Sequence, residues 1–226
     1  MKTADEALKE LIPHIVAGKD AQMQSFHKAE RIYLGVPTPA IEAAQKAWRD
    51  QMSVEERVEL ARALWDGDVF EGRIAAAKLL TQARLRPDDV AWELLQSWVT
   101  QIDCAAIADQ VATAVQKRLT ADPSRIEILR TWVEADSLWT KCAALDATLP
   151  WAKMNNLKEG DEAIRTEALT WAATYMADTT WATQKAVTTW LTSLAKHDAE
   201  RVKTFLADHG EALRPSLRKD IEKRIK

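Results

Sequence analysis

The sequence has little cysteine, glycine and proline, and it has no long run of uncharged residues. Its 226 residues include 2 Cys, 6 Gly and 7 Pro. Two cysteines form no disulfide framework, and so little glycine and proline excludes collagen-like and low-complexity chains. The longest uncharged runs, such as residues 168–177 and 186–195, are about half the roughly 20 residues that a membrane helix needs. We therefore expect no membrane as a partner.

The distribution of charge argues against a secreted protein and against a protein with a basic coat over its whole surface. Lysines and carboxylates fall within the first ten residues, where a signal peptide would need an unbroken apolar core. A cytoplasmic location is therefore predicted. The formal net charge of −3 argues against a basic coat over the whole surface, but it leaves room for one local basic face.

Apolar residues recur at three- and four-residue spacing, and nowhere does a sustained strand-like alternation appear. Val90, Leu94, Leu95 and Trp98 make one such stripe. Helix-start signals separate the stripes, among them a capping box of Ser53 with Glu56 and the prolines of Thr38-Pro39, Pro87-Asp88 and Asp122-Pro123. Five glycines are expected where helices stop: Gly18, Gly35, Gly67, Gly160 and Gly210. The pattern predicts an all-α protein of about a dozen helices.

A spaced set of aspartates indicates that these helices form repeats. Asp68, Asp103, Asp136 and Asp178 each precede an alanine-rich helix, at steps of 35, 33 and 42 residues. This period is near that of two-helix HEAT-type units. Alanine lets the inner helices of a curved solenoid approach closely, and the larger Trp and Leu fill the outer layer. The alternative is a non-repetitive bundle in which the aspartates are only helix caps.

Motifs for metal and nucleotide chemistry are missing from the sequence. It has no Gly-rich phosphate loop, H-E-x-x-H motif, paired C-x-x-C or nucleophile elbow. The four histidines are scattered and lack the spacing of metal ligands. We therefore expect neither a bound metal nor a cofactor.

Several short patterns, taken in order, carry a family resemblance. They are Tyr33–Pro39, Leu64-Trp65-Asp66 with Glu71 and Ala75–Ala77, Leu138-Trp139 with Ala143-Ala144, and Gln184-Lys185-Ala186 ahead of Trp190-Leu191. Together they resemble the DNA alkylation repair proteins of the AlkC/AlkD type, which are HEAT-like repeat DNA glycosylases. The resemblance runs from about residue 20 to the C-terminus.

The resemblance implies a single HEAT-like domain over residues 1–226, monomeric, which holds duplex DNA in the concave groove of a helical solenoid. Its substrates would be cationic alkylated bases such as 3-methyladenine or 7-methylguanine. A base alkylated on a ring nitrogen is already a good leaving group, so no strong general acid is needed. One carboxylate would stabilise the charge growing on the deoxyribose and position water.

The resemblance assigns this catalytic role to Asp109, which lies well inside the predicted helix after Asp103. The alternative is that Asp109 is solvated or paired with a lysine. Neighbouring family positions are altered here: Ala105 and Thr189 stand for two tryptophans, Cys142 for an arginine and Phe26 for a tyrosine. A small shift of the alignment would return Trp98 or Trp190 to the site. Weakened glycosylase activity is therefore predicted.

Contacts to DNA are expected from residues on the helices that carry these motifs. The candidates are Lys141, Lys185, Thr38 as a helix N-cap, Arg73 and Trp190, with Lys78 and a C-terminal group of Arg214, Arg218, Lys219, Lys223, Arg224 and Lys226. Lysines and arginines that track a phosphate backbone would make binding fall with salt. For the C-terminal group, a solvated helix surface is the alternative.

The tryptophans divide into two predicted sets. Six lie on apolar stripes and are expected in the core: Trp65, Trp92, Trp98, Trp132, Trp139 and Trp171. Trp181 and Trp190 are expected to be exposed. An alternative function from a different class is a helical-repeat scaffold for other proteins, or a DNA-binding protein without catalysis.

Overall fold

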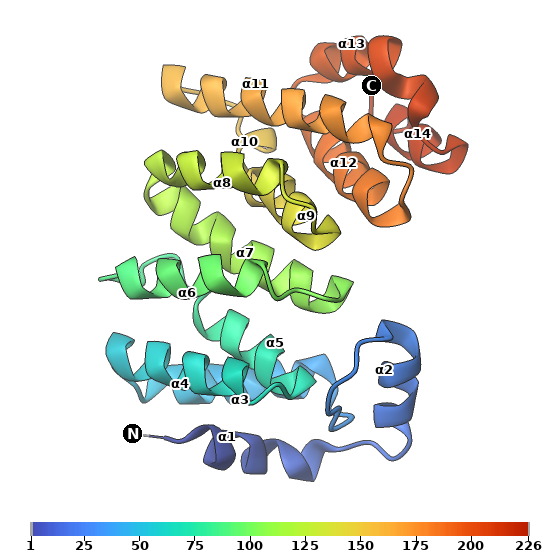
Figure 1. The fold of residues 1–226 in the computed structure, drawn as a ribbon. Coiled ribbons are helices and arrows are strands. Elements are labelled where there is room, and N and C mark those ends of the chain that lie inside the picture. The colour runs from blue at the N-terminus through green and yellow to red at the C-terminus, as the bar shows by residue number, and fades with distance from the viewer. Residues whose placement is uncertain (1, 226) are drawn as a thin grey trace. The chain divides into compact units, whose positions relative to one another are not determined.

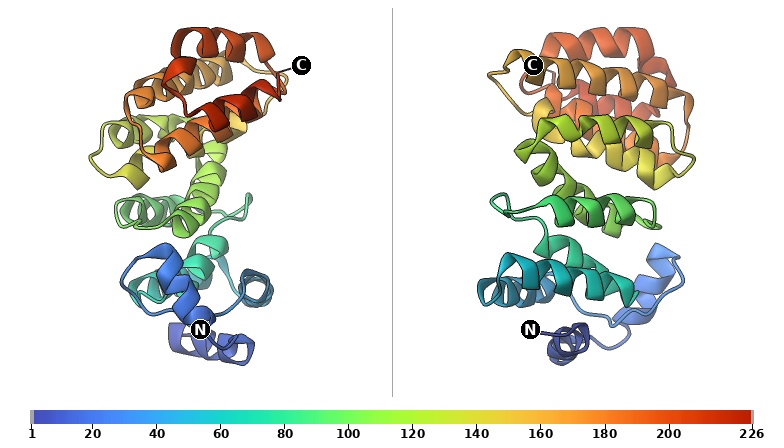
Figure 2. Two further views of the ribbon diagram at one scale, coloured as in Figure 1. Left: turned by 90° about the vertical axis from the view of Figure 1, so that its right-hand side faces the viewer. Right: turned by 60° about the vertical axis from the view of Figure 1, so that its left-hand side comes forward.

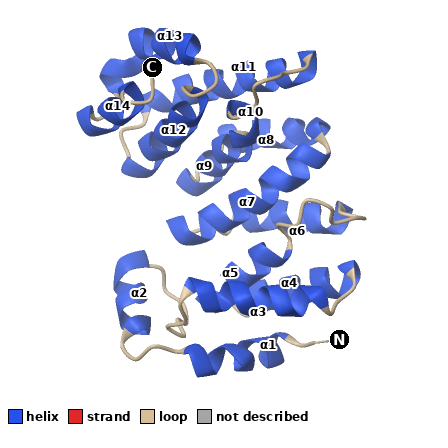
Figure 3. Ribbon diagram, turned by 180° about the vertical axis from the view of Figure 1, so that it is seen from behind, coloured by secondary structure: helices blue, strands red, loops and turns tan. Residues whose placement is uncertain are grey.

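The protein is entirely helical in residues 2–225, the part that the structure, a computed structural model, describes (Figures 1 and 3). These residues form fourteen α-helices and four short 3-10 helices and contain no strand, although Ile32 and Val69 make one isolated parallel bridge. The predicted all-α, HEAT-like repeat fold is thus confirmed. None of the helices in these residues is long and apolar enough to cross a membrane.

The chain forms two compact units, one up to Arg118 and one from Leu119 onward. The first unit contains α1 (Ala4–Leu11), α2 (Lys19–His27), α3 (Thr38–Asp50), α4 (Val54–Asp66), α5 (Phe70–Leu79), α6 (Asp89–Val99) and most of α7 (Ala105–Ala121), with the 3-10 helix Ile12–His14. The second contains α8 (Ile126–Val133), α9 (Leu138–Ala147), α10 (Leu149–Ala152), α11 (Glu159–Thr174), α12 (Trp181–Leu194), α13 (Ala199–His209) and α14 (Pro215–Glu222), with the 3-10 helices Pro123–Arg125, Tyr175–Ala177 and Gly210–Ala212. A single domain over the whole chain stays a prediction.

Within each unit, alternate helices pack side by side. In the second unit α9 contacts α12, and α12 contacts α14, so these three helices form one layer. The helices α8, α11 and α13 form the second layer (Figure 2). In the first unit α3 packs on α5 and α4 packs on α6. Such stacking of two-helix units is the arrangement that the repeat period predicts.

The four spaced aspartates mark the inner helix of successive pairs. Asp68, Asp103, Asp136 and Asp178 lie two or three residues before α5, α7, α9 and α12. Many alanines of these helices are buried, among them Ala75–Ala77 on α5 and Ala143 with Ala144 on α9. Small side chains at these positions let neighbouring helices approach closely, as expected.

Most helix boundaries follow the capping signals in the sequence. The Ser53–Glu56 capping box is present, and the Asp122 carboxylate accepts the backbone N–H of Ser124 at 3.1 Å. Other predictions are wrong. Of the five glycines, only Gly67 and Gly210 end a helix: Gly18 is the N-cap of α2, Gly35 lies in the loop before α3, and Gly160 lies inside the first turn of α11. Thr38 is the first residue of α3, and Pro37, which has no capping side chain, is the N-cap.

Tryptophan fills the outer helices. Trp65, Trp92, Trp98, Trp132 and Trp171 on α4, α6, α8 and α11 are all buried, as expected, while Trp139 on α9 is only half-buried. Trp65 and Trp98 stack at 4.4 Å between ring centroids, a separation at which aromatic pairs stabilise each other beyond their buried area.

A buried carboxylate explains one of the sequence patterns that led to the family. Glu71 on α5 is fully buried, and its oxygens accept the backbone N–H groups of Leu34, Gly35 and Val36 at 2.8–3.0 Å. Gly35 has a positive φ of 82°, and a Cβ there would lie 2.9 Å from the backbone nitrogen of Asp20. The Leu-Gly-Val segment and Glu71 therefore form one unit, which fixes the chain just before α3.

Candidate nucleic-acid interface

Asp109 has an exposed carboxylate on α7, in the first unit. Among the described residues its side chain has no hydrogen bond and no ion pair, and only its backbone carbonyl is used, by the Thr113 hydroxyl at 2.7 Å. Solvent reaches the carboxylate, yet the protein around it displaces enough water to raise its pKa above the ordinary value. The lysine pairing considered from the sequence is absent, so the group is available to a ligand.

Neither position of the first unit that was considered for a tryptophan beside Asp109, residue 98 or residue 105, places an exposed tryptophan ring there. Ala105, one helical turn before Asp109, is exposed and has only a methyl group. Trp98 is 1% exposed and stacked on Trp65. The idea that Trp98 returns to the site is therefore wrong, because this ring belongs to the core.

In the second unit, α12 and α14 enclose an open hollow of about 510 Å³, which we call the basic hollow. Its lining consists of Lys185, Thr188, Thr189, Thr192, Asp220, Lys223 and Arg224. Lys223 pairs with Asp220 at 3.3 Å. Lys185 and Arg224 have no ion pair within residues 2–225, so two cations remain for an anionic ligand.

The three threonines of the basic hollow have their hydroxyl protons in use. Thr188, Thr189 and Thr192 each donate to a backbone carbonyl of α12, at 2.7–2.9 Å. They therefore leave only oxygen lone pairs and methyl groups toward the hollow. Binding of a phosphate here depends on the charged groups of Lys185, Lys223 and Arg224.

Residues 141 and 142 show how the second unit departs from the family pattern. Cys142, at the position of the expected arginine, is buried, and its pKa is raised to about 12 by desolvation, so the thiol is uncharged near neutral pH. Lys141 is half-buried, and its ammonium group has no ion pair among the described residues. Lys141 stays a candidate phosphate contact, without the bidentate geometry that an arginine would give.

Trp190 was predicted to be exposed and to contact DNA, and this is wrong. The residue is 0% exposed, and its indole N–H donates to the Thr148 hydroxyl at 3.1 Å. Trp181, the other tryptophan expected at the surface, is 53% exposed, with the guanidinium of Arg214 5.7 Å above its ring. Of these two tryptophans, only Trp181 is exposed as predicted.

Arg73 is also unsuited to the DNA contact predicted for it. It is 9% exposed, it pairs with Asp68 at 3.0 Å, and its guanidinium lies 4.6 Å from the Trp65 ring centroid. Desolvation lowers its pKa. Its partners and burial make it part of the core, and the prediction is corrected accordingly.

The remaining candidates differ in whether their side chains are exposed and whether they already have a partner. Thr38 is exposed at the start of α3. Lys78 is bound to Glu42 at 2.6 Å. Phe26, at the position of the family tyrosine, is 77% exposed on α2, which has no buried residue.

The C-terminal group is partly neutralised. Arg218 pairs with Glu222 at 2.9 Å and Lys223 with Asp220. Lys219 and Arg224 are exposed and have no ion pair among the described residues, and Arg214 donates to the Thr179 carbonyl. Lys226 lies outside the described residues.

The sequence analysis missed that Lys185 and the end of α14 form one site. Lys185 and the two cations that follow α14, Lys223 and Arg224, are nearly 40 positions apart, and helix periodicity alone cannot pair them. In residues 2–225 no cluster of three or more His, Cys, Asp or Glu side chains could hold a metal ion.

Comparison with known proteins agrees with this architecture. The DNA alkylation repair enzyme family matches residues 7–223. A solved structure, a predicted DNA alkylation repair enzyme from Enterococcus faecalis, is similar with a TM-score of 0.74, covering 93% of this chain and 96% of that one at 17% identity, and it supports the fold. No curated protein sequence matches the chain. Since the family match spans nearly the whole sequence, the protein belongs to the DNA alkylation repair enzyme family.

Proposed function

We propose that this protein binds duplex DNA and slowly releases cationic alkylated bases, with Asp109 as the catalytic carboxylate. The observation that carries the proposal is the exposed carboxylate of Asp109, which has no partner among the described residues and whose pKa its surroundings raise. It stands at the position that the resemblance gives to the family's catalytic aspartate. A carboxylate whose pKa is raised by desolvation is found at functional sites more often than an ordinary surface carboxylate.

The reaction needs few groups. The bond between C1′ and the alkylated ring nitrogen breaks, and its electron pair leaves with the base, which becomes neutral. The deoxyribose is left as an oxocarbenium cation, which the Asp109 carboxylate stabilises electrostatically. Water then bonds to C1′, and its proton passes to Asp109 and on to solvent. A raised pKa makes Asp109 a better acceptor for that proton than an ordinary surface aspartate.

The basic hollow would supply phosphate contacts in this proposal. Lys185 and Arg224 have no ion pair in the described part of the chain, and Lys223 pairs with Asp220. Lys141 and Thr38 are further surface contacts. We also expect the protein to act as a monomer in the cytoplasm, which size-exclusion chromatography with light scattering and localisation imaging would test.

The test is a base-release assay on duplex DNA containing 7-methylguanine, under single-turnover conditions. Asp109→Asn is expected to lower the rate constant at least tenfold, because it removes the negative charge and the proton acceptor. Asp66→Asn, an exposed aspartate of α4 without an ion pair among the described residues, is the matched control and should release base at the wild-type rate. Equal release by wild type and Asp109→Asn would remove Asp109 from the mechanism.

A second function, DNA binding without excision, is favoured by the altered family positions. Ala105, Thr189 and Cys142 supply neither aromatic faces nor a charge, and Trp98 and Trp190 are buried. Without cation–π attraction, worth about 0.5–2 kcal/mol for each ring, lesion recognition is weaker. Salt-dependent binding of duplex DNA with no base release above the Asp109→Asn background would establish this second function.

A further inference from the structure

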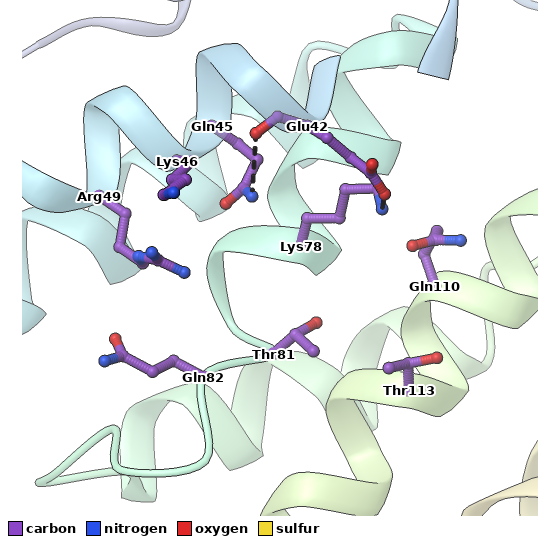
Figure 4. A pocket seen from close by; sticks show the side chains of 9 residues that line it. All are labelled: Glu42, Gln45, Lys46, Arg49, Lys78, Thr81, Gln82, Gln110 and Thr113. Carbon is purple, nitrogen blue, oxygen red and sulfur yellow. Dashed lines mark hydrogen bonds and ion pairs between the residues drawn. The ribbon is translucent and has the colours of Figure 1, made fainter. Parts of the chain in front are cut away.

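A polar pocket in the first unit is lined by residues other than Asp109. It has a volume of about 360 Å³, and we call it the amide pocket (Figure 4). Three elements line it: α3, the end of α5 with the residues after it, and α7. The lining residues are Glu42, Gln45, Lys46, Arg49, Lys78, Thr81, Gln82, Gln110 and Thr113.

The charge of the amide pocket favours an anionic ligand. Three cations and one carboxylate line it. Lys78 is held by Glu42 at 2.6 Å and Arg49 by Asp50 at 3.2 Å. Lys46 is exposed and has no ion pair among the described residues, so it is the cation most available to a ligand phosphate.

The glutamines supply hydrogen-bonding groups that the protein leaves unused. Gln45 donates its amide N–H to the Glu42 carbonyl at 3.2 Å, while its Oε1 is buried and receives no hydrogen bond. The Oε1 of Gln82 accepts from Arg57, which fixes that carboxamide and leaves its NH2 group without a partner within residues 2–225. Gln110 has no side-chain hydrogen bond in the same residues.

An unfilled buried acceptor points to a ligand that brings a donor. Leaving a buried polar atom without its hydrogen bond is costly, and the two threonines cannot supply the missing donor: Thr81 and Thr113 already donate to helix carbonyls. Because this oxygen is buried, the Gln45 carboxamide has to turn toward the pocket that it lines before a ligand N–H can satisfy the atom. Carboxamide groups are also the side chains that pair with the edge of adenine, accepting from its amino group and donating to its ring nitrogen.

From these features we propose that the amide pocket binds an adenine nucleotide, with the 6-amino group on the Gln45 carboxamide oxygen and the phosphate on Lys46 and Arg49. The volume is within the range of small-ligand pockets. The nucleotide is either a free mononucleotide or an unpaired adenine nucleotide of DNA, since both present the same groups. The proposal does not depend on Asp109 and stands or fails separately from base release.

The test is calorimetric titration of the full chain with adenosine 5′-monophosphate. The matched ligand is purine riboside 5′-monophosphate, which lacks only the 6-amino group and is expected to bind roughly tenfold more weakly. Adenosine, which lacks the phosphate, should also bind more weakly. Absence of binding, or equal affinity for the two monophosphates, overturns the proposal.

Two variants assign the contacts. Gln45→Met keeps the side-chain length and removes the acceptor, so it should fold and bind both monophosphates with equal, low affinity. Lys46→Ala should weaken the monophosphate and leave adenosine unchanged. Gln22→Met and Lys19→Ala on α2 are the matched controls. Retained discrimination in a folded Gln45→Met protein contradicts the assignment, with folding checked by circular dichroism.

Competition experiments identify the source of the nucleotide. A duplex with one unpaired adenine that displaces adenosine 5′-monophosphate better than the fully paired duplex assigns the pocket to DNA. Equal displacement by the two duplexes, with mononucleotide binding intact, assigns it to the free nucleotide. Inorganic phosphate that binds as tightly as the mononucleotide would show a general anion site and overturn the adenine assignment.

Discussion

The amide pocket of the first unit and the basic hollow of the second are both polar, yet they use their charges differently. In the amide pocket two of three cations are held by carboxylates of the same helix or its neighbour, and the free groups among the described residues are one cation, Lys46, and the carboxamides. In the basic hollow the hydroxyl protons are committed to α12, and two cations remain free. Neutral directional groups discriminate between ligands, and unpaired cations attract any phosphate.

This contrast separates recognition from affinity within one chain. A phosphate contact contributes a salt-dependent, sequence-independent share of binding, whereas a carboxamide distinguishes one base edge from another. Changes to the two sites should therefore have different signatures, and the following predictions test that difference in order of expected effect.

The largest effect is expected from removing the buried carboxylate that fixes the chain before α3. Glu71→Ala leaves three backbone N–H groups without their acceptor, which should lower the free energy of unfolding by about 3 kcal/mol or more. Glu71→Gln keeps one acceptor oxygen and should lose less. Urea denaturation followed by circular dichroism measures both.

The two cysteines can show whether that damage stays in the first unit. Cys104 lies in the first unit and Cys142 in the second, and both are buried with raised pKa values. In Glu71→Ala, alkylation of Cys104 by iodoacetamide should accelerate more than alkylation of Cys142. Equal acceleration would mean that the units do not respond separately, and the comparison would lose its basis.

An intermediate effect is expected from neutralising the free cations of the basic hollow. The double variant Lys185→Ala, Arg224→Ala should bind duplex DNA about tenfold more weakly at low salt and reduce the slope of log K against log salt by roughly 2. Electrophoretic or anisotropy titrations over a salt series measure the slope. The double variant Lys153→Ala, Lys196→Ala, two exposed lysines of the same unit, should leave the slope unchanged. A slope change of the same size in this control would assign binding to general surface charge.

The smallest effect concerns the stability of the protein and its dependence on pH. The pKa of Asp109 is raised in the folded state, so ionisation of this group opposes folding. Its effect is to lower the free energy of unfolding as the pH rises above the pKa of the unfolded chain, which is near 4. Asp109→Asn should therefore increase the free energy of unfolding at pH 7 by up to about 0.5 kcal/mol, with no gain near pH 3. Thermal melts of this variant beside Asp66→Asn provide the measurement, and a loss of stability at pH 7 would show a structural role for the carboxylate.

The repeat architecture could be predicted because its signals are local. Each spaced aspartate stands just before an inner helix, and alanine and tryptophan sort to different layers by size alone. The orientation of Trp190 could also have been better judged. Trp181 and Trp190 are nine residues apart, about 180° around a helix, so that only one of the two can face solvent.

The candidate sites were harder to predict because they combine distant positions. Arg73 lies beside an alanine-rich segment, but its partner Asp68 has a positive φ of 51° in the preceding turn, which no periodicity reveals. Gln45, Gln82 and Gln110 come from three separate elements and form no motif. Their significance depends on an unfilled acceptor, which appears only when the chain is folded.

The weak packing of α2 makes this helix the expected site of limited proteolysis. It has no buried residue, Phe26 projects into solvent, and Gly18 and Lys28 at its two ends have positive φ angles. Apart from the His27 ring, which stacks on Phe70 at 4.7 Å, the helix covers little apolar surface, so local opening of its other residues costs little. Chymotrypsin should therefore nick the native protein first after Phe26. The released N-terminal fragment should stay bound, because Trp48 donates its indole N–H to Glu10 across the cut.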